Sequence, residues 1–141
     1  MAYWLYKSEP GTWSWDDQVT CGVEGTPWDG VRNHMANNFM KEMKVGDRGF
    51  FYHSVNEKRI VGLVEVIGEH RPDPKDETGR FGMVVLRALA PLPEPVTLAD
   101  IKATPGLEDM VLVKNSRLSV QPVTAAEWKT VCRMGGLKKA P

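Results

Sequence analysis

A tryptophan followed by charged and amide side chains stands in the stretch TPWDGVRN at residues 26–33. The proline before Trp28 has a fixed φ and biases its own predecessor toward an extended conformation, so the indole is held on a stiff turn. An indole offers a stacking face for a nucleobase, while Arg32 and Asn33 can bind phosphates and read the edge of a base. The alternative is that Trp28 caps the core and that Asp29 is the N-cap of the next helix.

Two further clusters of aromatic and polar side chains fall at the ends of predicted strands, one at residues 6–8 and one at residues 52–54. If these strand ends meet the Trp28 turn, the three segments form a pocket. In that pocket Lys7 would bind a phosphate and Ser54 would read the base. The predicted ligand-binding residues are Trp28, Ser54, His53, Lys7, Ser8, Asn33, Arg32 and Tyr6.

The neighbours His53 and Ser54 suggest hydrolase chemistry. Adjacent residues on a strand point to opposite faces, so these two side chains cannot act together as base and nucleophile. A Ser54 nucleophile would need His34 or His70 from elsewhere in the chain. No catalytic residue is therefore predicted, although an enzyme acting on a base in the same pocket, with His53 as its acid or base, stays open.

The three histidines and two cysteines show no metal-ligand spacing. Cys21 and Cys132 lie far apart and have no C-x-x-C partner, so free thiols are expected in place of a zinc site or a disulfide framework. The glycines at positions 22, 25 and 30 match no phosphate-binding loop. We expect neither a metal nor a cofactor.

A chain of 141 residues with 42% hydrophobic and 26% charged residues is expected to form one domain, residues 1–141, around a single core. Its 18 basic and 18 acidic residues cancel, and the sequence pI is about 6.8. Contact with nucleic acid must therefore be local, without a broad basic surface. The apolar start of the chain is too short for a signal peptide or a membrane span, so we expect a cytoplasmic protein with no membrane partner. We also expect a monomer.

Alternating apolar patterns predict strands at residues 3–8, 48–54, 60–67, 81–89 and 117–121. The prolines at positions 91, 93 and 95 are expected to stop the fourth of these strands, and Pro122 is expected to close the fifth. Five or six short strands with three or four helices predict an α+β fold, a mixed, mostly antiparallel β-barrel decorated by helices.

Helices are predicted at residues 15–21 behind Ser14, from Val31 onward, at 97–103, and after Thr124. In the helix that begins at Val31, an apolar stripe is expected to pack and a polar stripe to face solvent. The apolar stripe is Val31, Met35, Phe39 and Met43, and the polar stripe is Asn33, Asn37 and Lys41. The tail at residues 137–141 is expected to fray.

Five blocks of sequence, in order and spread over nearly the whole chain, resemble the signatures of the EVE domain family. The blocks are YWLYKSEP at 3–10, WDGVRN at 28–33, FYHS at 51–54, IVG at 60–62 and RLSVQP at 117–122. The resemblance implies a PUA-like fold related to the YTH readers of methylated adenine in RNA. It also implies a reader of modified bases, with methyl- or hydroxymethylcytosine in DNA as the favoured ligand and a modified RNA base as the alternative.

The same resemblance makes Trp28 a wall of the ligand pocket. It implies pocket-lining strand ends at Lys7 with Ser8 and at His53 with Ser54, and the WDGVRN block includes Arg32 and Asn33. One departure is Val55, which stands where the family has an asparagine after the His-Ser pair. A flat protein-interaction surface around Trp28 is the remaining alternative.

Overall fold

Six apolar segments pair as the strands of one sheet in the computed structural model, which describes residues 1–141. The strands are β1 Tyr3–Ser8, β2 Thr26–Trp28, β3 Arg48–His53, β4 Arg59–Pro72, β5 Gly82–Thr97 and β6 Val120–Val123. Their order is β2-β5-β4-β3-β1-β6, with β1 parallel to β3 and every other pair antiparallel. The predicted α+β class with a mixed, mostly antiparallel sheet is confirmed, and β2 and β6 form the two edges.

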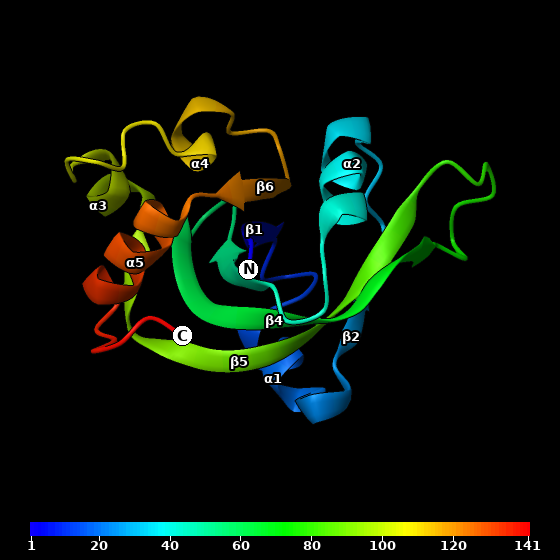
Figure 1. Ribbon diagram of the computed structural model, residues 1–141, viewed down its shortest axis with the longest axis horizontal. Coiled ribbons are helices and arrows are strands. Elements are labelled where there is room, and N and C mark those ends of the chain that lie inside the picture. The colour runs from blue at the N-terminus through cyan, green and yellow to red at the C-terminus, as the bar shows by residue number, and fades with distance from the viewer.

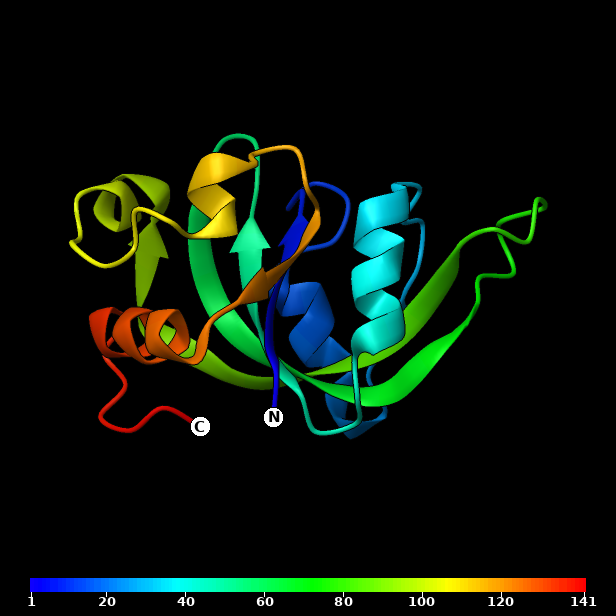
Figure 2. The ribbon, with the colours of Figure 1, turned by 45° about the horizontal axis from the view of Figure 1, so that its top comes forward.

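The sheet is strongly curved, because the long strands β4 and β5 bend beneath the shorter ones (Figure 1). The helices are α1 Trp15–Thr20, α2 His34–Glu42, α3 Leu98–Lys102, α4 Val111–Lys114 and α5 Ala125–Met134, with a short 3-10 helix η1 at Gly22–Glu24. In Figure 2, α2 stands on one side of β1 and β3, and α4 and α5 stand on the other.

Alternation of side chains along the strands creates two cores in place of the single core expected. On β1, Trp4 and Tyr6 point into one core, and Leu5 points into the other. Each core contains 15 buried residues. α2 covers the first core, while α3, α4 and α5 cover the second.

Helix starts that depend on local caps are confirmed. The Ser14 hydroxyl accepts a hydrogen bond from the Asp17 amide at the start of α1. Thr124 and Glu127 form the predicted capping box at α5. Each cap joins residues three positions apart, so the sequence alone specifies it.

The predicted start of the helix after Trp28 is wrong. α2 begins at His34, because Asn33 is its N-cap and the Asn33 side-chain oxygen accepts a hydrogen bond from the Ala36 amide at 2.9 Å. Asp29 is therefore not the cap. Val31 is buried ahead of the helix in an irregular segment.

The predicted faces of this helix are right in part. Val31 and Met43 of the apolar stripe are buried and Phe39 packs against the first core. Met35 is 53% exposed, however, and Asn37, expected to face solvent, is 2% exposed. The Asn37 side-chain oxygen accepts a hydrogen bond from the Gly82 amide at 3.0 Å and lies 3.0 Å from His70 Nε2. These contacts with the β4–β5 hairpin satisfy the buried amide and fix the rotation of α2.

β5 continues through its three prolines, contrary to the prediction that they end it. Gly62 of β4 pairs with Pro91, and the next pair joins Ile60 to Val96, so the intervening residues of β5 bulge out of the ladder. Pro93 and Pro95 lie in this bulge and lose no ladder hydrogen bond. At Pro91, β5 pairs with β4 on one side and is an edge on the other, because β2 pairs with β5 at residues 84–86. The last strand, β6, similarly includes Pro122, which an edge strand tolerates.

The C-terminal tail was predicted to fray, but it packs against the second core. Leu137 and Ala140 contact the second core, and Trp128 Nε1 donates a hydrogen bond to the Pro141 carbonyl at 3.3 Å. None of the helices combines the length and the apolar character needed to cross a membrane.

Candidate functional site

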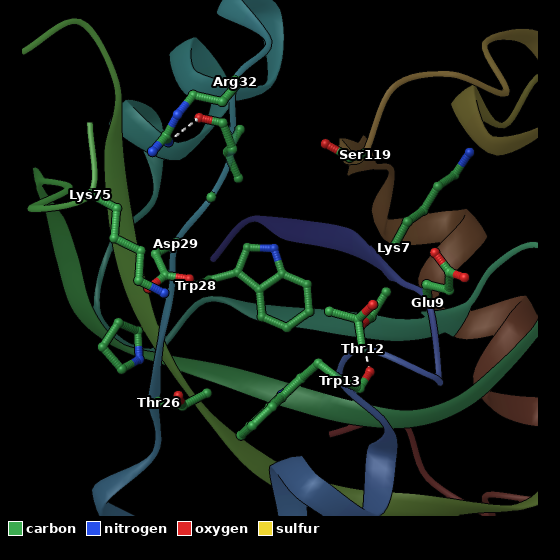
Figure 3. Close-up of a pocket in the computed structure, with 14 residues that line it drawn as sticks. Lys7, Glu9, Thr12, Trp13, Thr26, Trp28, Asp29, Arg32, Lys75 and Ser119 are labelled. Atoms are coloured by element: carbon green, nitrogen blue, oxygen red, sulfur yellow. Dashed lines mark hydrogen bonds and ion pairs between the residues drawn. The ribbon is translucent and has the colours of Figure 1, made fainter. Parts of the chain in front are cut away.

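A cavity of about 630 Å³ opens where the ends of β1 and β2 meet the loop after β1. This volume lies within the range of roughly 300 to 1,000 Å³ that is usual for sites binding small molecules. Figure 3 shows the Trp28 ring at its centre. The lining residues are Lys7, Ser8, Glu9, Thr12, Trp13, Thr26, Pro27, Trp28, Asp29, Gly30, Val31, Arg32, Lys75 and Ser119.

Trp28 belongs both to the first core and to the cavity wall. Its ring makes edge-on contacts with Tyr6 at 5.6 Å and Phe51 at 5.7 Å between centroids, and it is 9% exposed. Both interpretations of this tryptophan, core cap and pocket wall, therefore hold. Trp28→Ala would remove core packing as well as the wall, at a cost of about 3 to 5 kcal/mol.

Trp13 supplies a second indole beside Trp28 (Figure 3). Its Nε1 donates a hydrogen bond to the Gln18 side-chain oxygen at 2.9 Å, and the buried Gln18 amide donates to the Leu86 carbonyl at 3.0 Å. The Ser8 hydroxyl donates to the Trp13 carbonyl. Trp13 is half-buried, so its ring can offer surface to a ligand.

Three cations reach the rim of the cavity. The Lys7 ammonium donates to the Ser116 carbonyl and lies 5.9 Å from the centroid of the Tyr52 ring. Burial of this ammonium lowers the pKa of Lys7. Arg32 and Lys75 are more exposed and lie on the opposite side, so positive charge flanks the Trp28 ring.

Both of the more exposed cations are paired with carboxylates. Lys75 Nζ lies 3.1 Å from Asp29 Oδ2, and Arg32 Nη1 donates to Asp73 Oδ2 at 2.9 Å. Asp73 Oδ2 also accepts from the Gly30 amide at 2.9 Å, and its Oδ1 accepts from the Lys75 amide at 2.8 Å. The β4–β5 hairpin thus fastens the segment that follows Trp28.

The environment of Asp73 favours its charged form. Burial of the carboxyl group raises its pKa, but the hydrogen bonds from the Gly30 and Lys75 amides and from Arg32 outweigh that effect, so the pKa of Asp73 is lowered. The carboxylate is therefore an ionised anchor at neutral pH. Arg32 can still reach an anion, because 39% of its side chain is exposed.

Four of the eight residues predicted to bind ligand line the cavity together: Lys7, Ser8, Trp28 and Arg32. The other four lie outside it. Tyr6 is fully buried and its hydroxyl donates to Met43 Sδ at 3.0 Å, a setting in which burial raises the pKa of Tyr6 well above its usual value. Asn33 is occupied as the N-cap of α2.

His53 and Ser54 support the cavity wall from behind. His53 is 8% exposed and its Nε2 accepts a hydrogen bond from the Trp15 amide at 3.0 Å. The Ser54 amide donates to the Ser8 carbonyl at 2.9 Å. Both residues were predicted to contact the ligand directly, but neither of them lines the cavity.

Sequence reasoning missed most of the polar lining and the second indole. The missed residues are Glu9, Thr12, Trp13, Thr26, Pro27, Asp29, Gly30, Val31, Lys75 and Ser119. A short-range signal existed for Trp13, which follows directly on the turn after β1. Lys75 and Ser119 carry no such signal, because they reach the cavity from the β4–β5 hairpin and from the turn before β6.

No group of three or more His, Cys, Asp or Glu side chains is arranged to hold a metal ion. Burial raises the pKa of the Cys132 thiol to about 12, so this cysteine is an inert core residue.

A curved mixed sheet with an indole-walled, cation-rimmed cavity at its strand ends defines the class as a small α+β domain with a candidate ligand cavity. The family model described as "EVE domain" matches residues 2–134, and the chain therefore belongs to the EVE domain family. A solved structure of a protein from Rhodopseudomonas palustris is 58% identical, with a TM-score of 0.94, covering 99% of this chain and 96% of that chain.

Two solved complexes extend the comparison. The human THYN1 protein in complex with DNA containing 5-methylcytosine is 33% identical, with a TM-score of 0.85, and covers 100% of both chains. The YTH domain of the Zygosaccharomyces rouxii MRB1 protein, in complex with N6-methyladenosine RNA, is 18% identical with a TM-score of 0.59, covering 95% of this chain and 86% of that chain. The latter likeness concerns the fold alone. The family resemblance and the structural similarity to YTH domains are confirmed.

Proposed function

We propose that this protein binds a modified base of DNA, with 5-methylcytosine favoured over hydroxymethylcytosine, in the cavity walled by Trp28. The observation that carries the proposal is the pairing of two indoles with flanking cations at one opening. The human relative in complex with 5-methylcytosine DNA supports it. We also propose that the curved sheet is a PUA-like barrel acting as a monomer, since one chain supplies the whole cavity.

The base would leave the helical stack, or come from a single strand, and lie against the Trp28 and Trp13 rings. Stacking contributes about 1 to 3 kcal/mol per base, comparable with the few kcal/mol needed to flip a paired base. The surplus would come from phosphates held by Lys7 and by Arg32 or Lys75, which lie on opposite sides of the ring.

Selectivity for the methyl mark needs more than apolar contact. Burial of one methyl group contributes about 0.8 kcal/mol, or roughly fourfold in affinity. A hydroxymethyl group left without a hydrogen-bond partner would cost about 1 to 3 kcal/mol. The hydroxyl groups of Thr12, Thr26 and Ser119 line the cavity and are the groups available to tell such marks apart.

We propose binding without catalysis. Arg32 and Lys75 are engaged in ion pairs with carboxylates. His53, the sequence's candidate acid or base, is held behind the wall with both ring nitrogens in contact with protein groups. Turnover of a bound nucleotide by the purified protein would contradict this part of the proposal.

The test is a binding titration at low salt with matched DNA and RNA oligonucleotides carrying cytosine, 5-methylcytosine, hydroxymethylcytosine or N6-methyladenine. We expect preference for methylated DNA, and about a tenfold loss in Trp13→Ala, which removes a half-buried wall ring. Tyr3→Ala is the matched control, because it removes a half-buried ring from the second core. Equal weak binding to every strand, unchanged in Trp13→Ala, would refute a base pocket, and preference for RNA would assign the alternative ligand.

A further inference from the structure

His53 lies at the end of β3, outside the cavity, and contacts the segment that carries the Trp13 wall. Its Nε2 lies 3.0 Å from the Trp15 amide nitrogen, and its Nδ1 lies 3.0 Å from Glu57 Oε1. Because a backbone amide can only donate, Nε2 must be an unprotonated acceptor. The ring proton is therefore on Nδ1, where it is donated to the Glu57 carboxylate.

The Trp15 amide is one of the anchors of the residues between β1 and α1. The Thr12 and Trp13 amides donate to the Glu9 carbonyl, and the Ser8 hydroxyl donates to the Trp13 carbonyl. Trp15 is the first residue of α1, two positions after Trp13. The His53 acceptor thus fixes the backbone on the C-terminal side of Trp13, and the Ser8 hydroxyl holds the carbonyl of Trp13 itself.

We propose that His53 is a positioning residue for the Trp13 wall, and that a proton on its Nε2 loosens the wall and weakens ligand binding. The ligand-binding part of this inference rests on the proposed function. An imidazolium has an N–H at both nitrogens, so it would place a donor against the Trp15 donor. The wall would then lose the part-buried hydrogen bond between the Trp15 amide and the His53 ring.

The charged groups around the His53 ring confine the effect of protonation to the hydrogen bond with the Trp15 amide. Glu57 Oε1 contacts Nδ1 directly, and Arg59 Nε donates to the same oxygen at 2.9 Å. From α1, the Asp17 carboxylate is turned toward the Ser14 amide at 2.9 Å, and Asp16 is exposed. An imidazolium therefore keeps its partner in Glu57 while the Trp15 amide loses its acceptor.

A ligand-free experiment tests the positioning role alone. The Trp13 indole N–H and Trp15 amide signals are followed by proton–nitrogen NMR between about pH 7.5 and about pH 5.5, alongside the ring signals of His53. In the wild type both signals should move with the midpoint of the His53 ring signals. They should stay fixed in His53→Gln, whose side-chain oxygen can accept from Trp15 but does not titrate. A double variant, His34→Gln with His70→Gln, keeps His53 as the sole histidine and should behave as the wild type.

The same proteins are then titrated with 5-methylcytosine DNA at both pH values. Wild-type affinity should fall about tenfold at the lower pH, the size expected for one lost hydrogen bond. Affinity of His53→Gln should not fall. An equal fall in His53→Gln, or immobile Trp13 and Trp15 signals in the wild type, would overturn the inference. If no protein binds the DNA at either pH, the proposed function fails, while the ligand-free signals still decide the role of His53.

Discussion

Val55, the residue after the His53-Ser54 pair, occupies a backbone conformation that favours asparagine over valine. Val55 has a φ of 70°, in the left-handed region, and is 56% exposed. A β-branched side chain is strained there, whereas asparagine adopts this conformation readily. An asparagine, which the family resemblance leads us to expect here, would thus suit the turn between β3 and β4, and Val55 does not line the cavity.

We predict that Val55→Asn stabilises the protein by about 1 kcal/mol, because it relieves the left-handed strain. Chemical denaturation measures the change in the free energy of unfolding. Val45→Asn is the matched control, since Val45 is 60% exposed and has no positive φ. An equal gain in both variants would point to surface polarity as the cause, and no gain in Val55→Asn would contradict the strain argument.

At the scale of elements, the β4–β5 hairpin fastens the cavity to the rest of the sheet. In this hairpin, the Asp73 carboxylate accepts hydrogen bonds from the Gly30 amide and from Arg32. At the start of β5, the Gly82 amide donates to the Asn37 side chain of α2. Removing the Asp73 charge should therefore disturb the segment between Trp28 and α2.

We predict that Asp73→Asn lowers the free energy of unfolding by about 2 kcal/mol at neutral pH, since an amide cannot accept from all three of the donors. Glu77→Gln, an exposed change in the same loop, is the control and should have little effect. A cost in Asp73→Asn no larger than in Glu77→Gln would show that the anchor contributes nothing.

Acid should weaken the same loop. Interactions lower the pKa of Asp73 and, chiefly through the Thr78 hydroxyl, lower that of Asp76 to about 2. A lowered pKa means that the folded state holds these protons less tightly than the unfolded chain. The stabilisation is therefore complete above the ordinary value of 3.8 and is lost as the pH falls from there toward about 2. Denaturation between about pH 5 and about pH 2 should show a shallower loss in Asp73→Asn than in the wild type.

The elements that sequence predicted well are those specified by near neighbours. Ser14 and Thr124 cap α1 and α5 through residues three positions away. Asn37 was assigned to solvent because its partners, His70 and Gly82, are distant in sequence. β5 was cut short because proline forbids a ladder hydrogen bond, and only the register with β4 reveals the bulge that removes the need for one.

The same distinction applies to the cavity. Trp28 was found from its own turn, whereas Lys75 reaches the cavity only when the β4–β5 hairpin folds back. The strand ends that were predicted to meet do meet, since Ser8 pairs with His53 in the parallel register of β1 and β3. Sequence could not show that Ser8 faces the cavity while His53 supports the wall from behind.

The whole molecule has a formal net charge of zero, so DNA contact of the proposed kind must be local. With three cations at the cavity rim, the slope of log affinity against log salt should be about −3 or shallower, since each neutralised phosphate contributes about −0.9. Lys7→Gln should reduce the slope by about one such step, and Lys102→Gln, a distant change on α3, should not. A slope steeper than about −6 would indicate an extended phosphate interface.

In the proposed function, the base enters between the two indoles of one cavity. Five tryptophans give five indole N–H signals, at positions 4, 13, 15, 28 and 128. Trp128 belongs to the second core, across the sheet from the cavity, so it is an internal control. Proton–nitrogen NMR during addition of 5-methylcytosine DNA should shift the Trp13 and Trp28 signals and leave Trp128 in place. Saturable binding with the Trp13 and Trp28 signals unmoved would show that the base lies elsewhere, and would refute the proposed pocket.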